Sequence, residues 1–337
     1  MNNNTSKKYN AVDGLRAIAC IGIVLMHVRR NGHYALESNI TGIIGSFTFF
    51  VSLFLMISAF GMCCGYYKRI LDNTISLTDF YKKRFLRVLP YFSILVLIDV
   101  CMKPSITKIY EGFADLTLMF GFTLKRMSVI GVAWFLGLIF VFYMIFPFFC
   151  VLIENKRRAW IVFVIACIWH FVAAHHFKLD RMNILFSGVF FVVGGLIYLY
   201  REQIEKINRW IILGVIVISM ITFYMLDKNY WMAIILFGAM LMYAVSVQNC
   251  KFTILDNKVF KFIAGISMEI YLSHMVIFRV VEKLGLTHKF GKGALQYAIT
   301  TVLVLVGSIV FAFVLKKIIE IVGKFLSKKF SKKESVA

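Results

Sequence analysis

Residues 11–28 read AVDGLRAIACIGIVLMHV, a stretch in which Asp13, Arg16 and His27 are the ionisable residues. The hydrocarbon core of a bilayer is about 30 Å thick and takes roughly 20 apolar residues for one helical crossing. This stretch therefore predicts a membrane-spanning helix near the start of the chain. The preceding MNNNTSKKYN and the lack of a small-residue cleavage site favour a retained helix over a signal peptide.

The rest of the chain repeats this pattern. Of its 337 residues 60% are hydrophobic and 16% are charged, and the mean hydropathy is +0.80, which excludes an ordinary soluble domain. Apolar windows lie at 11–28, 40–65, 86–102, 130–153, 158–175, 184–200, 209–226, 230–248, 262–284 and 296–323. They predict an all-α polytopic membrane protein with about ten transmembrane helices.

Basic residues set the predicted orientation. With a cytoplasmic N-terminus the inner loops and tails hold about 24 Lys and Arg and the outer loops about 12, so we expect both termini in the cytoplasm. Residues 1–323 would form a single transmembrane domain and residues 324–337 a basic cytoplasmic tail. The net charge of +21 is explained by this topology and by contact with anionic lipid, and we expect no nucleic-acid partner.

Cysteine and histidine spacing indicates no metal site. Of the seven cysteines only Cys63 and Cys64 are close in sequence, and neighbours form neither a disulfide framework nor a zinc site. The outer cluster His170, His175 and His176 lacks the further ligands that a metal would need. The glycines of GMCCG and VVGG, Gly61, Gly65, Gly194 and Gly195, are interpreted as close helix packing.

The first span carries ionisable side chains inside the membrane. A charge at the bilayer centre costs at least about 2.5 to 3.5 kcal/mol on insertion scales. Arg16 and His27 are eleven residues apart, which returns to within about 20° of one helix face and separates them by about 16 Å along the axis. They form either one functional inward face or two side chains that reach the inner and outer headgroups.

Two further segments carry charge into the membrane. In YKKRFLRVLPYF, Arg84 and Arg87 share a helix face at the inner edge, where they bind phosphates or only set the topology. In GISMEIYLSHMVIFRVVEK, Glu269 lies at hydrocarbon depth and is expected to face a polar interior. Arg279 and Glu282, three residues apart, are expected to pair with each other.

Five segments occur in a family-like order: VDGLRAIACIGIVLMH (12–27), VSLFLMISAF (51–60), KKRFLRVLPYF (82–92), VAWFLGLIFVFYMIFPFF (132–149) and SMEIYLSH (267–274). Together they resemble the acyltransferase-three family of integral-membrane acyltransferases, which is distinct from the membrane-bound O-acyltransferases. The likeness covers nearly the whole chain. It implies a multi-pass protein of the cell membrane, of the bacterial plasma-membrane type.

The resemblance also implies a reaction. The co-substrate would be cytoplasmic acyl-CoA, usually acetyl-CoA, with no bound cofactor, and the acceptor a glycan or other molecule at the cell surface. His27 would be the catalytic base with Arg16 as its electrostatic partner, and Arg84 and Arg87, beside Lys83, would hold the CoA phosphates. Supporting roles would fall to Asp13, Ser58, Trp134, Glu269, Tyr271 and His274.

One departure from the family pattern concerns the fourth span. Many members have a Glu five residues after Trp134, where this chain has Ile139. We hypothesise that Glu269 replaces that carboxylate. General-base catalysis at His27 is the favoured mechanism and an acyl-His27 intermediate the alternative. A transporter using Arg16, His27 and Glu269 in its path ranks second, because no matched pair of broken helices is evident; a non-catalytic scaffold is the third class.

Overall fold

The computed structural model describes residues 8–102, 104–118, 122, 130–226, 228–250 and 253–334, with side chains up to Phe325. The regular elements in this part of the chain are helices. Their bounds are α1 Asn10–Gly32, α2 Ser38–Ser46, α3 Phe50–Met62, α4 Lys68–Leu71, α5 Leu77–Met102, α6 Ile106–Thr117, α7 Trp134–Leu152, α8 Lys156–His175, α9 Ile184–Leu199, α10 Arg201–Ile204, α11 Arg209–Met225, α12 Tyr230–Ser246, α13 Lys258–Gly265, α14 Ser267–Lys283 and α15 Ala294–Glu334. Short 3₁₀ and π turns join α2, α3 and α4 into one rod over Ser38–Leu71.

The described helices fit a membrane. Seven of them, counting the Ser38–Leu71 rod as one, are long and apolar enough to cross a bilayer, and the bent pair α13–α14 makes an eighth. Two further apolar helices, α9 and α11, are shorter, at 16 and 17 residues. Each predicted window thus contains a helix, and the prediction of an all-α polytopic membrane protein is confirmed. The number of crossings and the side of the termini stay predictions.

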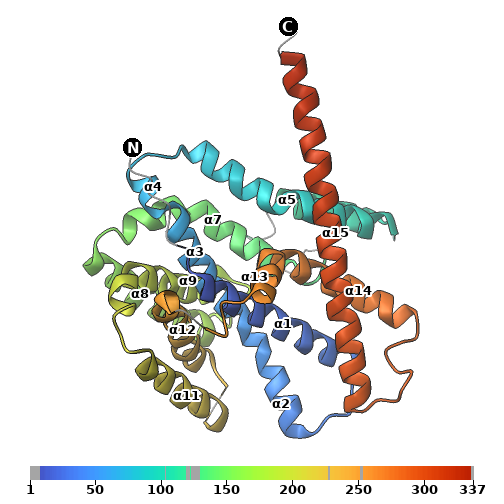
Figure 1. Ribbon diagram of the computed structural model, residues 1–337, viewed down its shortest axis with the longest axis horizontal. Coiled ribbons are helices and arrows are strands. Elements are labelled where there is room, and N and C mark those ends of the chain that lie inside the picture. The colour runs from blue at the N-terminus through green and yellow to red at the C-terminus, as the bar shows by residue number, and fades with distance from the viewer. Residues whose placement is uncertain are drawn as a thin grey trace.

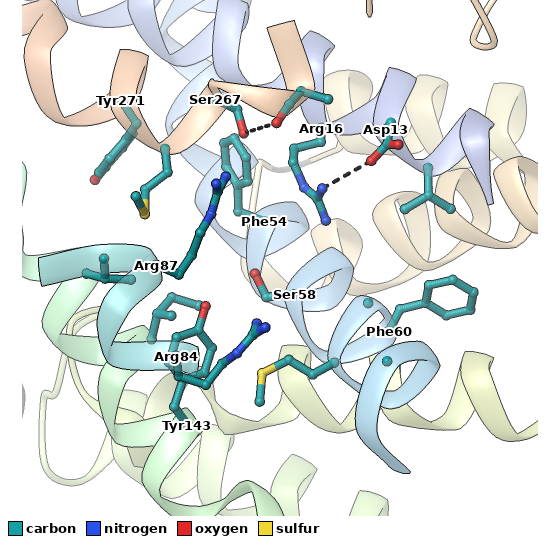
Figure 2. A pocket seen from close by; sticks show the side chains of 18 of the residues that line it. Asp13, Arg16, Phe54, Ser58, Phe60, Arg84, Arg87, Tyr143, Ser267 and Tyr271 are labelled. Atoms are coloured by element: carbon teal, nitrogen blue, oxygen red, sulfur yellow. Dashed lines mark hydrogen bonds and ion pairs between the residues drawn. The ribbon is translucent and has the colours of Figure 1, made fainter. Parts of the chain in front are cut away.

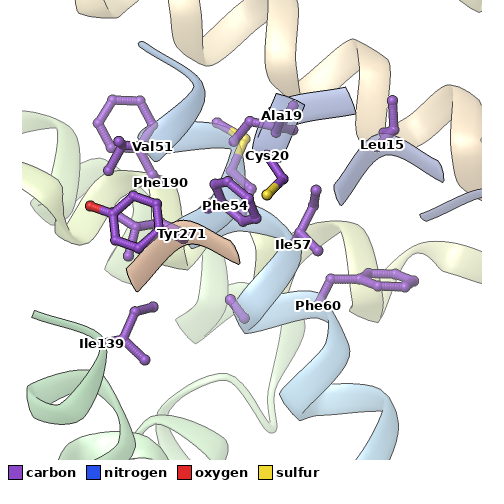
Figure 3. Close-up of a cluster of buried hydrophobic side chains, with 14 of the residues drawn as sticks. Leu15, Ala19, Cys20, Val51, Phe54, Ile57, Phe60, Ile139, Phe190 and Tyr271 are labelled. Carbon is purple, nitrogen blue, oxygen red and sulfur yellow. The ribbon is translucent and has the colours of Figure 1, made fainter. Parts of the chain in front are cut away.

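Some helices of the bundle shown in Figure 1 form its packed centre, and others form a rim with an apolar outer surface. Its centre is formed by α1, α3, α9 and α12, where Leu15, Phe54, Ile57 and Phe60 are buried together (Figure 3). The rim helices α5, α8, α11 and α15 instead turn large apolar side chains outward. Exposed apolar surface of this extent is costly in water, so these helices are the ones that face the lipid.

The predicted crossing at 262–284 is not one straight helix. It breaks between α13 and α14 with a bend of 72° at Ile266. Gly265, a weak helix former, ends α13, and its carbonyl group accepts hydrogen bonds from Arg87 of α5 and Lys316 of α15 instead of from the next turn. Side chains from two other helices therefore satisfy the backbone group that the break sets free.

One other expectation needs correction. Arg279 does not pair with Glu282: its guanidinium lies 3.7 Å from the carboxylate of Asp99 on α5, because the bundle brings α5 against the C-terminal half of α14. Residues 324–334 continue α15, a helix of 41 residues, and the assignment of 324–337 to a basic cytoplasmic tail stays a prediction. Figure 1 shows the C-terminal part of α15 projecting beyond the other helices.

Candidate functional site

A cavity of about 540 Å³ opens between α1, α3, α5, α7 and the start of α14. This volume lies within the roughly 300 to 1,000 Å³ of small-molecule sites. Its walls combine basic, hydroxyl and aromatic side chains with aliphatic ones (Figure 2). Among the lining residues are Asp13, Arg16, Phe54, Ser58, Gly61, Gly65, Arg84, Arg87, Phe135, Ile139, Tyr143 and Tyr271.

Three arginines from two helices meet at this cavity. On α1, Arg16 donates to the carboxylate of Asp13 at 3.1 Å, one helical turn before it. On α5, Arg84 and Arg87 are three residues apart and so lie on one face. In Figure 2 their guanidinium groups point across the cavity toward Ser58 of α3 and Arg16 of α1. With one carboxylate beside them, the three arginines give this end of the cavity a net positive charge.

Aromatic rings hold Arg84. Its Nη2 donates to the Tyr66 hydroxyl at 2.6 Å, and its guanidinium lies 4.6 Å from the centroid of the Tyr66 ring and 5.7 Å from that of Tyr143. Cation–π contacts of this kind attract the guanidinium without neutralising it. Arg84 is therefore pre-oriented and still carries a full charge for a ligand.

Arg87 is held more weakly. Its Nη1 lies 3.8 Å from Oε1 of Glu269, and its Nη2 donates to the Gly265 carbonyl at 3.3 Å. The same two acceptors bind Lys316 more closely, at 3.1 Å and 2.7 Å. The Glu269 side chain is only 3% exposed whereas that of Arg87 is 44% exposed. Lys316 can thus keep the buried carboxylate neutralised while Arg87 turns into the cavity.

A pair of histidines lies behind the inner wall of the cavity. The rings of His27 on α1 and His274 on α14 are 5.0 Å apart between centroids. Tyr271, one turn before His274, lines the cavity, and its ring lies 5.9 Å from that of His274. The Tyr271 hydroxyl donates to the Val132 carbonyl at 2.8 Å, which fixes the ring between the cavity and the histidine pair.

A fourth arginine contacts the start of α7. Arg181, in the segment between α8 and α9, donates to the Thr48 carbonyl at 3.2 Å and lies 5.4 Å from the centroid of the Trp134 ring. Trp134 in turn packs edge-on against Phe135, which lines the cavity. Arg181 therefore joins the α8–α9 segment to the helix that forms one wall of the cavity.

Comparison with known families decides the class of protein. The acyltransferase-three family model, described as an acyltransferase domain, matches residues 9–316. The chain belongs to this family. No curated protein and no solved structure matches it. Together with the apolar helices, the match makes the chain a multi-pass membrane acyltransferase that transfers acyl groups other than aminoacyl groups.

The acyltransferase gathers most of the residues singled out from sequence, but in two groups. The cavity is lined by Asp13, Arg16, Ser58, Arg84, Arg87 and Tyr271. His27 and His274 form the pair behind it, and Trp134 lies beside Phe135 at the start of α7. Lys83 is exposed and does not line the cavity, because it is one residue away from the face that carries Arg84.

The structure separates the proposed replacement carboxylate from the base. Glu269 forms ion pairs with Arg87 and Lys316 at the break between α13 and α14. The side chain packed against the His27 ring is His274. Ile139, where many family members have Glu, lines the cavity as an apolar residue. The geometry does not favour Glu269 as the group that orients His27.

The four glycines that were interpreted as close helix packing fall into two pairs. Packing explains Gly194 and Gly195: an added Cβ would lie 2.2 Å from the Met56 carbonyl oxygen of α3 and 2.6 Å from the Phe149 ring, respectively. For Gly61 and Gly65 that interpretation is wrong. An added Cβ at Gly61 would meet only the Arg16 guanidinium, at 3.6 Å, and one at Gly65 would meet no atom of the described residues within 4 Å. Both line the cavity, where their lack of a side chain leaves room.

Sequence reasoning missed Tyr66, Tyr143, Arg181 and Lys316. Tyr66 and Tyr143 lie in or beside recognised segments, but nothing in the sequence indicates that they flank Arg84. Lys316 opens a Lys-Lys pair that reads as an ordinary inner flank of the last span. Arg181 lies in a loop between two apolar windows, and its charge is the only feature of the sequence that could have drawn attention to it.

Proposed function

We propose that this acyltransferase binds acyl-CoA, usually acetyl-CoA, in the cavity and passes the acyl group to a glycan hydroxyl at the outer face of the membrane. One observation carries the proposal: three arginines flank a cavity of about 540 Å³ whose inner wall, Tyr271, backs onto a pair of histidines. CoA carries phosphates at one end and a thioester at the other. A ligand with this polarity matches a cavity that is lined by arginines at one side and by Tyr271, next to the histidine pair, at another.

In this proposal Arg84 and Arg87 bind the CoA phosphates. A guanidinium presents a planar fork of donors that matches phosphate oxygens. Arg84 is already oriented by its tyrosines, and Arg87 exchanges its long contact with Glu269 for a phosphate while Lys316 keeps Glu269 paired. Arg16 adds positive charge from the opposite wall. The cavity then holds the donor with its acyl end toward Tyr271.

The chemical step is general-base catalysis by His27. Its imidazole accepts the proton of the acceptor hydroxyl as that oxygen attacks the thioester carbonyl carbon. The new C–O bond forms, the C–S bond breaks, and the proton passes from His27 to the departing CoA sulfur. A thioester is already activated, so no Ser or Cys relay is needed. Ser58, whose hydroxyl lines the cavity, is a candidate donor to the developing oxyanion.

The side of the membrane follows from the charge bias. With Arg84, Arg87 and both termini on the cytoplasmic side, the donor enters from the cytoplasm and the acceptor meets His27 from the outer half. The acceptor class rests on the family resemblance. A strain that lacks the protein should release surface polysaccharide with less ester-linked acetyl than the parent, and unchanged acetyl content would point to another acceptor.

The reaction is tested with purified protein. We expect it to release CoA from acetyl-CoA, slowly with water as acceptor and faster with an acetylatable oligosaccharide. His27→Ala should abolish this release, and Lys83→Gln, at an exposed position outside the cavity, should keep it. Wild-type protein that leaves acetyl-CoA intact but moves an acetylated glycan across vesicles would support the transporter class instead.

A further inference from the structure

His274 has no solvent-exposed surface and offers two ring nitrogens to its surroundings. Nδ1 lies 2.6 Å from the Tyr271 carbonyl oxygen. A carbonyl only accepts hydrogen bonds, so Nδ1 must carry a proton. In the neutral ring Nε2 is then a bare acceptor. Nε2 is buried and has no hydrogen-bond partner among the described residues.

A buried acceptor of this kind needs a donor. The nearest ring is that of His27, 5.0 Å away between centroids and tilted by 52°. His27 is only partly buried and keeps some accessible surface, whereas His274 has none. Both histidines are on helices that pack directly against each other, α1 and α14. A hydrogen bond between the two rings requires a rotation of the His27 ring that turns one of its nitrogens toward Nε2 of His274.

We propose that His274 is the positioning residue for His27, accepting a hydrogen bond from the His27 ring N–H through its own Nε2. The inference rests on the proposed function, in which His27 is the base. In this arrangement a neutral imidazole, and not a carboxylate, orients the His27 ring. The chain has no carboxylate at Ile139, and Glu269 is paired with Arg87 and Lys316.

The arrangement fixes the tautomer of His27. A proton on the nitrogen that faces His274 leaves the lone pair on the accessible nitrogen, where the acceptor hydroxyl arrives. When His27 takes up a second proton, its inner N–H still donates to His274, so the ring stays in place through the reaction. The Tyr271 carbonyl holds His274, and the Tyr271 hydroxyl is held by Val132. The chain of contacts runs from the cavity wall to the base.

Two substitutions of His274 separate positioning from packing. In His274→Gln the amide N–H can donate to the Tyr271 carbonyl and the amide oxygen can accept from His27. His274→Leu fills a similar volume and can do neither. We expect the Leu variant to lose at least about tenfold in kcat with an unchanged KM for acetyl-CoA, and the Gln variant to recover most of that loss.

A second, structural measurement, the tautomer of His27, does not require acetyl-CoA or any other acyl donor. With ¹⁵N-labelled histidine, the seven histidines are assigned by single substitutions, and the ring nitrogens of His27 are compared among the wild-type, His274→Gln and His274→Leu proteins. We expect a single neutral tautomer of His27 in the wild-type and Gln proteins and a mixture in the Leu protein. If the Leu variant does not fold, the wild-type and Gln spectra still give the answer.

Three outcomes would overturn the inference: full kcat in the Leu variant, equal losses in the Gln and Leu variants, or a mixed His27 tautomer in the wild-type protein. Failure of the proposed function is distinct. Wild-type protein that leaves acetyl-CoA intact would reject the donor, while the nitrogen spectra would still report whether His274 orients His27.

Discussion

The two ends of the site are built differently. The arginine end lies on α5, a rim helix with 28% of its apolar window buried, and its side chains are partly exposed beside an open cavity. The histidine end lies between α14 and α1, whose apolar window is 67% buried, and His274 has no exposed surface. Charged groups that capture an anion tolerate water, whereas a base that must hold one tautomer benefits from packing. We therefore expect substitutions at the arginine end to change KM and those at the histidine end to change kcat.

The largest expected effect is at the histidine end. His27→Asn keeps hydrogen-bonding capacity but cannot take up a proton at neutral pH. We expect turnover to fall at least about 100-fold, the low end of what a positioned base contributes, while the KM for acetyl-CoA and the melting temperature stay near wild type. Steady-state kinetics in detergent measure both constants. Retention of more than about a tenth of wild-type turnover would place the base elsewhere.

The second effect is at the arginine end. Replacing both Arg84 and Arg87 with Gln exchanges charge-assisted hydrogen bonds worth about 1.5 to 3 kcal/mol each for neutral ones worth about 0.5 to 1.5 kcal/mol each, so donor affinity should fall by at least about tenfold. The affinity that remains should also depend less on salt concentration, because fewer charges take part in binding. Lys at either position should restore affinity only in part, because an ammonium lacks the planar fork. Equilibrium binding of CoA at two salt concentrations tests this.

The matched control for the arginine end is Lys83→Gln. It removes a positive charge from the same helix at an exposed position outside the cavity, and CoA affinity should stay near wild type. A double arginine variant that binds CoA as tightly as this control would show that Arg84 and Arg87 only set the topology.

The glycines give a third test, of packing against open space. Gly194→Ala forces a Cβ to within 2.2 Å of the Met56 carbonyl, so α3 and α9 must separate. Overpacking of this kind costs about 1 to 3 kcal/mol and should lower the melting temperature. Gly61→Ala meets only ordinary contact, at 3.6 Å, and should leave the melting temperature unchanged. Equal destabilisation by the two variants would mean that no space lies beside Gly61.

The smallest expected effect lies outside the membrane-spanning segments. Hydrogen bonds from Lys261 and Asn10 hold the pKa of Asp256, just before α13, below its usual range. A lowered carboxyl pKa stabilises the fold above the unfolded value of about 3.9, and this contribution is lost as pH falls through the folded pKa. Asp256 is partly exposed, so Asp256→Asn should cost less than about 1 kcal/mol at pH 7. Melting temperatures at pH 7 and pH 3 should differ slightly less in the variant, with kcat and KM unchanged.

Span length and composition were enough to predict the helices but not their breaks. The window 262–284 reads as one largely apolar stretch, and nothing in it shows that Gly265 ends one helix and Ser267 begins the next. The break is stable because Lys316, about 50 residues later, donates to the Gly265 carbonyl. Stabilisation of this kind comes from a distant segment, and periodicity within one window does not contain it.

The site shows the same limit. Arg84 and Arg87 share a face because their spacing within one helix requires it, and this was predictable. The approach of His274 to His27 depends on how α14 packs against α1, and the pairing of Arg279 with Asp99 on how it packs against α5. Local spacing favoured Glu282 as the partner of Arg279, and the tertiary fold selected another. Local spacing thus predicted which residues share a helix face better than which side chains touch across helices.

The length of α15 provides a way to measure depth in the membrane. At 1.5 Å per residue its 41 residues span about 62 Å, roughly twice a hydrocarbon core of about 30 Å. A single helix of this length is long enough to pass through both interfaces and to continue into water. Spin labels at successive outward-facing positions of α15 would be compared for their accessibility to oxygen, which is high in the hydrocarbon, and to a water-soluble relaxing agent. The position at which the second becomes higher than the first marks the membrane surface. Lys316 donates a hydrogen bond to the Gly265 carbonyl and forms an ion pair with Glu269, and Arg87 contacts the same two groups. The profile would therefore also give the depth of Arg87 relative to the headgroups.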